Sequence, residues 1–131
     1  MTIAVFTANK NLTYDNVKTF VMSANNNAVY VKSTDGKTKA IFNKDKVYGI
    51  IDRDYLLYEL CNKIHDCTGI KFSILFIDGA AIDINADYYD FDVYTNTVTF
   101  YIGCKDGNKS YVKTVGKFNM DNLVGFEKVT D

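Results

Sequence analysis

Apolar residues recur at helical spacing in the stretch that joins the two halves of the chain. Asp52 stands where its carboxylate can accept hydrogen bonds from the first turn of a helix, and Gly69 stands where the helix would end. Polar residues fill the opposite face. The apolar face consists of Leu56, Leu57, Leu60, Cys61 and Ile64. The pattern predicts one principal amphipathic helix over about residues 53–67.

The most apolar run of the chain follows that helix and predicts a strand. It contains Phe72 and the continuous apolar run 74–77, and the Asp78-Gly79 pair ends it. Because apolar residues do not alternate with polar ones here, we expect a strand that is covered on both faces.

Other segments predict strands on both sides of this centre. Residues 2–8 alternate well enough for a first strand, with Ile3 and Val5 facing inward. Residues 13–24 fit one face of a helix, but they are also rich in β-branched side chains, and we favour a strand. Asp35-Gly36 and Asp106-Gly107 predict tight hairpin turns between further strands.

The segments that follow these two hairpins resemble each other. Residues 42–50 read FNKDKVYGI and residues 118–126 read FNMDNLVGF. Internal duplication of residues 28–51 and 97–129 explains the match about as well as convergent turn chemistry does. The chain is therefore predicted to be a single α+β domain over 1–131, with mainly antiparallel β-sheet and two related β-hairpin units that flank the helix.

Composition limits the classes of function. The chain has 131 residues, 47% hydrophobic and 24% charged, which is typical of one globular domain. A net charge of −1 gives no electrostatic reason to bind nucleic acid. The longest apolar run is too short to cross a bilayer, and the three cysteines lack the spacing of a disulfide framework. We therefore expect a cytoplasmic protein without membrane contact.

Two groups of residues suggest metal binding. Cys61, His65, Cys67 and Cys104 include zinc-ligand types, but their spacing matches no standard zinc finger and Cys61 lies on the apolar helix face. We therefore predict no zinc site.

The second group has the ligand spacing of a calcium loop. Asp83, Asn85 and Asp87 fit its first three positions, but tyrosines stand where the loop requires glycine and the last glutamate. We predict no metal and no cofactor.

The segment 87–94 carries the main candidate site, because aromatic and acidic residues alternate along it. Tyrosines supply large contact areas at low entropic cost, and the aspartates suit a basic partner. We expect Tyr88 to be exposed, since it is out of phase with Phe91 and Val93. The predicted binding residues are Asp87, Tyr88, Tyr89, Asp90, Asp92 and Tyr94. Asp90 and Asp92 also share one side of a strand, as the paired acids of a hydrolase would.

These observations favour a non-enzymatic binding protein that acts by protein–protein contact or by sequestering a ligand. The many Lys, Asn, Ile and Tyr residues have A/T-rich codons, which suggests a phage or mobile element and an inhibitor of a host system as one example. One alternative is a structural virion or assembly subunit, and a second is a small hydrolase with paired aspartates. Exposed strand edges also favour a homo-oligomer.

Overall fold

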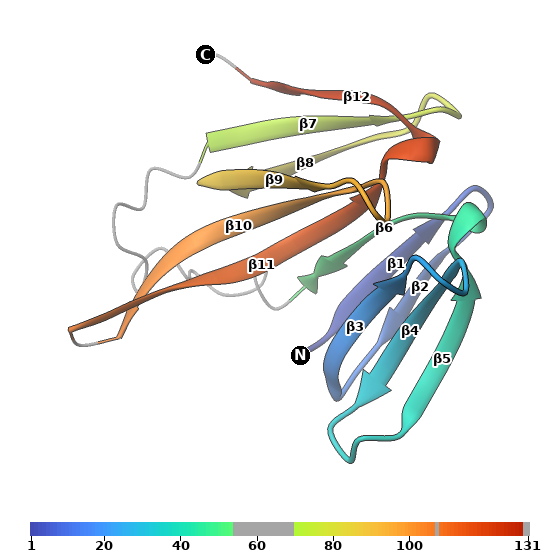
Figure 1. Ribbon diagram of the computed structural model, residues 1–131. Coiled ribbons are helices and arrows are strands. Elements are labelled where there is room, and N and C mark those ends of the chain that lie inside the picture. Colours follow the sequence, from blue (N-terminus) through green and yellow to red (C-terminus); the bar gives the residue numbers. More distant parts are fainter. Residues whose placement is uncertain (54–69, 107, 130–131) are drawn as a thin grey trace.

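The computed structural model describes residues 1–53, 70–106 and 108–129, and this part of the chain is built from antiparallel strands (Figure 1). In the first half the strands are β1 (Ile3–Thr7), β2 (Asn11–Tyr14), β3 (Val17–Ser23), β4 (Ala28–Ser33), β5 (Thr38–Asn43) and β6 (Val47–Asp52). In the second half they are β7 (Ile70–Phe76), β8 (Ala81–Ala86), β9 (Tyr88–Asp92), β10 (Thr97–Asp106), β11 (Lys109–Asn119) and β12 (Leu123–Lys128). Short 3-10 turns, η1 (Lys44–Lys46) and η3 (Met120–Asn122), precede β6 and β12.

These strands form one six-stranded sheet and two three-stranded sheets. The six-stranded sheet has the order β2-β1-β6-β11-β10-β9. The sheet β12-β7-β8 packs on one of its faces, and the sheet β3-β4-β5 packs on the opposite face of its β1-β6 part (Figure 1). Two separate hydrophobic cores result, one on each side of the six-stranded sheet.

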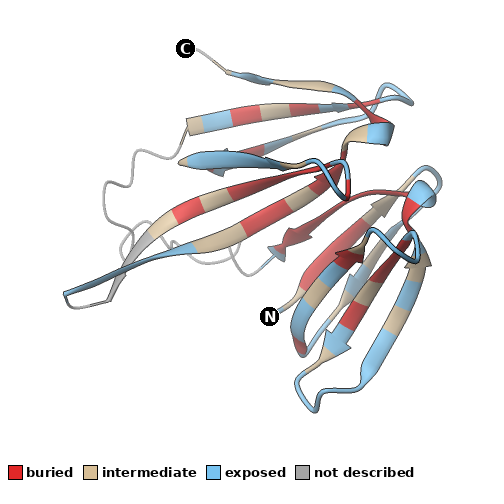
Figure 2. Ribbon diagram, in the orientation of Figure 1, coloured by how far each residue is buried: buried red, intermediate tan, exposed pale blue. Residues whose placement is uncertain are grey.

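Strand β6 contributes to both cores because its side chains alternate between the two faces. Val47 and Ile50 pack in the core beneath β3-β4-β5, whereas Tyr48 and Ile51 pack in the core beneath β12-β7-β8. All six residues of β6 are buried, as the continuous red of this strand in Figure 2 shows. β6 is thus covered on both faces.

The first six strands and the last six follow one plan. In each set the first two strands form a hairpin, the next three form a three-stranded meander, and a 3-10 turn leads to a last strand that pairs with the first. We call residues 3–52 the first unit and residues 70–128 the second unit. The β10-β11 hairpin is the longer one, with strands of ten and eleven residues against six and six in β4-β5.

Details of pairing and turns also match between the units. A four-residue turn before β4 ends at Asn27 with φ 49°, and the turn before β10 ends at Asn96 with φ 53°. The carbonyls of these two residues accept hydrogen bonds from the amides of Lys44 and Met120, at 2.9 Å in each unit. This is a match of fold and turn chemistry, and the predicted duplication of residues 28–51 and 97–129 stays a prediction about the origin of the chain.

The two units are joined by strand pairing and by a buried polar contact between the 3-10 turns. β6 pairs with β11 in the antiparallel sense. The Asn119 amide donates to the Lys44 carbonyl at 2.8 Å and accepts from the Lys44 ammonium at 3.1 Å. The Asn122 amide donates to the carbonyls of Asp45 and Val47, at 2.9 and 3.1 Å. Side chains of the second unit therefore satisfy backbone groups of the first.

The predicted α+β fold class is wrong. Antiparallel sheet accounts for nearly all the described chain, which contains no helix of seven or more residues. The physical reason is that each sheet is covered by another sheet, so the hydrophobic residues are buried without a helix layer. The helix predicted over 53–67 lies, apart from Arg53, outside the described residues. No helix in the described part is long and apolar enough to cross a membrane.

The strand predictions fare better. Residues 13–24 contain the end of β2 and all of β3, which confirms the preference for strand, and Asp35-Gly36 does turn the β4-β5 hairpin, with φ 86° at Gly36. The expectation that residues 72–77 are covered on both faces is wrong. Leu75 and Ile77 are 39% and 56% exposed, while Phe72, Ile74 and Phe76 point into the core. Apolar residues on both faces of this strand concealed the alternation.

Candidate functional site

Strand β9 and the residues next to it form an exposed border of the molecule. β9 is the last strand of the six-stranded sheet, and among the described strands it pairs with β10 alone. We call residues 87–94 the β9 edge. It contains all six predicted binding residues, and the structure places them in one continuous segment (Figure 1).

The aromatic residues of the β9 edge divide into two groups. Tyr89 and Phe91 turn toward the core, where the Tyr89 ring lies 5.1 Å and the Phe91 ring 6.2 Å from the ring of Phe126. Each is nevertheless 50% exposed, because this border of the sandwich is open. These two rings close the core and also offer apolar surface to a partner.

The second group projects from the fold. Tyr88 is 58% exposed, Val93 is 83% exposed and Tyr94 is 87% exposed. Side chains of this size stay largely in water only at an energetic cost, so three of them along one exposed border indicate a contact surface. The exposure of Tyr88 agrees with the expectation from its phase in the sequence.

The equivalent strand of the first unit shows that the fold does not require these side chains. β3 pairs with β4 in the register that β9 has with β10, so Tyr88 corresponds to Thr19. The four-residue turns that follow are also equivalent, and Val93 and Tyr94 correspond to Ala24 and Asn25. The second unit therefore exposes large side chains where the first unit has small or polar ones.

Two of the aspartates have structural roles. Asp87 accepts a hydrogen bond from the backbone amide of Gly103 at 2.8 Å. Asp92 accepts from the amides of Tyr94 and Thr95 at 2.9 and 3.4 Å, which fixes the turn after β9. The hydrogen bond from the Tyr94 amide is the main cause that lowers the pKa of Asp92 below its usual value. These two carboxylates therefore hold the backbone in place at the two ends of the β9 edge.

Asp90 lies on the face of β9 that looks away from the larger core. It is opposite Thr99 of β10, and both line a shallow hollow of about 280 Å³ together with Tyr101 and Lys117. Asp92 and Asp90 both line this hollow, and Lys117 lies in the same lining.

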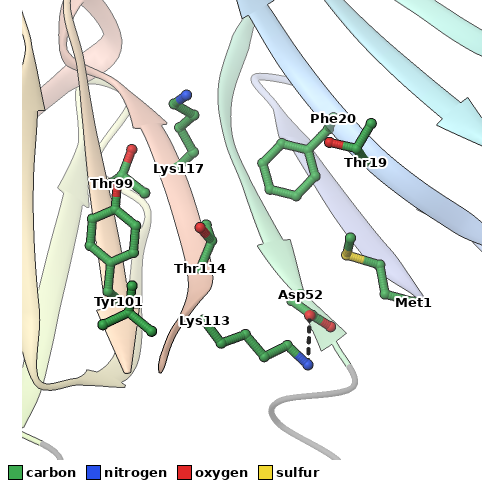
Figure 3. A pocket seen from close by; sticks show the side chains of 10 residues that line it. Met1, Thr19, Phe20, Asp52, Thr99, Tyr101, Lys113, Thr114 and Lys117 are labelled. Carbon is green, nitrogen blue, oxygen red and sulfur yellow. Dashed lines mark ion pairs between the residues drawn. The ribbon is translucent and has the colours of Figure 1, made fainter. Parts of the chain in front are cut away.

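A second hollow, of about 350 Å³, adjoins the first and shares Thr99, Tyr101 and Lys117 with it. Figure 3 shows these residues on one side, with Phe20 of β3 on the other. At one end the buried Asp52 carboxylate forms an ion pair with Lys113, at 3.3 Å.

Sequence reasoning missed this hollow. Asp52 stood out only as a helix cap, whereas it is the last residue of β6 and is 1% exposed. Lys113 and Lys117 belong to β11, in which lysines recur at every fourth position, and this was the available signal. The partner of Lys113 lies in the other unit, which no local pattern reveals.

The catalytic and metal hypotheses gain little from the geometry. Of the two carboxylates in the suggested acid pair, that of Asp92 is occupied by hydrogen bonds from the amides of Tyr94 and Thr95. Within the described residues no three His, Cys, Asp or Glu side chains are grouped as metal ligands. Asp83 forms an ion pair with Lys71 at 3.7 Å, and Asp87 is held by Gly103. Cys61, His65 and Cys67 lie outside the described residues, as does the side chain of Cys104.

Comparisons with known proteins give no independent assignment. No protein family, no curated protein and no solved structure matches the chain.

Proposed function

We propose that this chain is a non-enzymatic binding protein that contacts another protein through the β9 edge. The observation that carries the proposal is the difference between equivalent strands. β3 and β9 have the same register with their neighbouring strands and are followed by equivalent turns. The first unit has small or polar residues at three positions where the β9 edge exposes Tyr88, Val93 and Tyr94. Side chains that the fold does not need, and that are costly to expose, have a use outside the fold.

The backbone of β9 supports the same function. An unpaired strand border offers N–H and C=O groups to an extended segment of a partner, and neighbouring side chains supply specificity. Tyrosine is enriched in the buried centres of interfaces because it gives a large rigid contact and a hydrogen-bonding hydroxyl. Asp90 in the β9 edge and Lys117 beside it would select a partner with complementary charges. If the chain is encoded by a phage or mobile element, the partner is a host protein that it inhibits.

Ligand sequestration is the second candidate, and the hollow of about 350 Å³ is the observation that favours it. Tyr101, Lys113 and Thr114 on its wall provide hydrogen-bond donors for a small polar molecule. Tyr88, Val93 and Tyr94 do not line this hollow. Substitution of these residues should therefore weaken binding of a protein partner and leave binding of a small molecule in the hollow unchanged.

The test exchanges the exposed residues for their equivalents in the first unit. The variant Tyr88→Thr, Val93→Ala, Tyr94→Asn keeps the register and the turn, so the fold should be retained. Loss of two tyrosines from the centre of an interface should weaken binding by about 30-fold for each of them, since such residues each contribute roughly 2 kcal/mol. The matched control is Val21→Asp, which places aspartate at the position in β3 equivalent to Asp90.

The measurement has two steps. The immobilised wild-type chain captures its partner from an extract of the source organism, and the purified partner is then titrated against the wild-type chain, the exchange variant and the control. Equal affinity of all three chains would contradict the proposal. A small molecule that co-purifies with the wild-type chain and with the exchange variant alike would establish sequestration in its place.

A further inference from the structure

The contact that joins the two units contains a close fit between a glycine and an aromatic ring. β6 and β11 pair with Gly49 opposite Phe118, Ile50 opposite Lys117 and Ile51 opposite Gly116. A Cβ atom on Gly49 would lie 2.8 Å from Cε1 of Phe118 and closer still to Cδ1. The fully buried ring of Phe118 therefore occupies the space that any side chain at residue 49 would need.

The chain carries a second copy of each of these two surfaces. Within the units β12 is equivalent to β6 and β5 is equivalent to β11, because they occupy the same places in the strand order. Gly125 of β12 is equivalent to Gly49, since each follows the register shift at the start of its strand. Phe42 of β5 is equivalent to Phe118, since each precedes the asparagine that caps the 3-10 turn.

Neither second copy is paired with a further described strand, although the Phe42 side chain is partly buried against the core of its own unit. Among the described strands β12 pairs with β7 alone and β5 pairs with β4 alone. A Cβ atom on Gly125 would meet no atom of the described residues within 4 Å, so the space that Phe118 fills at Gly49 is open here. A hollow of about 380 Å³ surrounds this position, and it is lined by Ser73, Leu75, Val124, Gly125, Phe126 and Glu127.

Both surfaces expose apolar side chains, together with Glu127 and Lys128 on β12 and Thr38, Lys39 and Asn43 on β5. Val124 is 67% exposed and Leu75 is 39% exposed beside Gly125, and on β5 Ile41 is 60% exposed. In the first unit the residues equivalent to Leu75 and Val124 are Phe6 and Tyr48, and the second unit covers both. The second unit covers this face of the first unit, whereas the equivalent face of the second unit is exposed.

We propose that β12 of one chain pairs with β5 of a second copy of the same chain, in the register of β6 with β11. Phe42 of the second copy then lies over Gly125, Ile41 lies opposite Phe126, and Ala40 lies opposite Glu127. The proposed contact between two chains has the same strand pairing as the contact between the two units of one chain. The interface is head to tail, which generates a ring or a filament.

The 3-10 turns fit the same arrangement. Within the chain the amide of Asn119 donates to the carbonyl of Lys44, and the equivalent residues across the new interface are Asn43 and Met120. The interface between chains has Glu127 where the internal one has Ile51, and it lacks the equivalent of the Lys44 ion pair with Asp121. It buries less apolar surface, so we expect assembly that is reversible and depends on concentration.

The experiment uses the full chain with one block on each surface. In Gly125→Leu the new side chain occupies the space that Phe42 of the second copy would fill. A Cβ atom at this position meets no described atom within 4 Å, so the monomer should fold normally. Ile41→Asp places a charge at an exposed position of β5. Light scattering and sedimentation over a concentration series should show the wild-type mass rising from 14.8 kDa to at least twice that value, while each variant alone stays monomeric.

Mixing the variants is the decisive step. Gly125→Leu retains a working β5 and Ile41→Asp retains a working β12, so an equimolar mixture should form a heterodimer and nothing larger. A wild-type chain that stays monomeric would overturn the proposal. So would an Ile41→Asp chain that still assembles, because its assembly would then not depend on β5.

Amide hydrogen exchange of the wild-type chain provides a second test that needs no variant. In the wild-type chain, raising the concentration should slow exchange in β5 and β12 together, while the β9 edge stays unchanged. Slowing that is absent from either β5 or β12 would also overturn the proposal.

Discussion

Replacing Gly49 by alanine is expected to lower the free energy of unfolding by about 2 to 3 kcal/mol, the upper range for forcing extra atoms into a packed core. The new Cβ would overlap the ring of Phe118, which has no exposed surface into which it can move. Because this overlap lies where β6 meets β11, the substitution forces the two units apart. Urea unfolding followed by tyrosine fluorescence measures the change.

The matched control is Gly125→Ala, at the equivalent residue of the second unit. Its Cβ enters open space, so we expect a change of less than about 0.5 kcal/mol at a concentration at which the chain is monomeric. Equal losses at both positions would mean that glycine is needed there for its backbone alone. The ring over Gly49 would then have no part in joining the units.

Asn119→Ala is expected to destabilise the chain by about 3 kcal/mol, because it removes one partner from a buried polar network. Asn119 is fully buried and binds both the carbonyl and the ammonium of Lys44, which is itself only 4% exposed. Without the asparagine, the buried ammonium retains the carboxylate of Asp121 at 3.6 Å. Thermal and urea unfolding of the purified variant measure the loss.

Asn43→Ala provides the comparison, since Asn43 caps η1 as Asn119 caps η3. Its side chain accepts from the Asp45 amide at 3.0 Å, but the residue is exposed and is not part of the buried network. Loss of such a cap should cost about 1 kcal/mol. If the two alanine variants lose the same stability, capping explains both, and the network between the units contributes nothing beyond it.

Local chemistry accounts for what the sequence could predict. The Asp35-Gly36 turn, the β-branched segments and the phase of Tyr88 depend on neighbours along the chain, and these predictions agree with the structure, whereas Gly107 of the Asp106-Gly107 turn lies outside the described residues. The resemblance between residues 42–50 and 118–126 is visible in the sequence because both contain the Asn that caps the 3-10 turn and a glycine at the same place in the strand that follows.

Features that depend on distant partners were not predictable. The six-strand plan of each unit extends to β1-β2 and β7-β8, which share only a pattern of apolar residues, so the match there emerges from pairing alone. The carboxylate of Asp87 was interpreted as a contact for a partner, but it binds the amide of Gly103 on a neighbouring strand. The α+β class was inferred from a single amphipathic segment, and sheet-on-sheet packing supplies the cover that a helix was expected to give.

A partner that binds through the β9 edge must cover the backbone of this segment. Amide hydrogen exchange of the chain, with and without the captured partner, measures that cover. We expect slower exchange in β9 and in the turn that contains Val93 and Tyr94, with β3 and its turn unchanged. Protection confined to other strands, with the β9 edge exchanging as fast as in the free chain, would contradict this expectation.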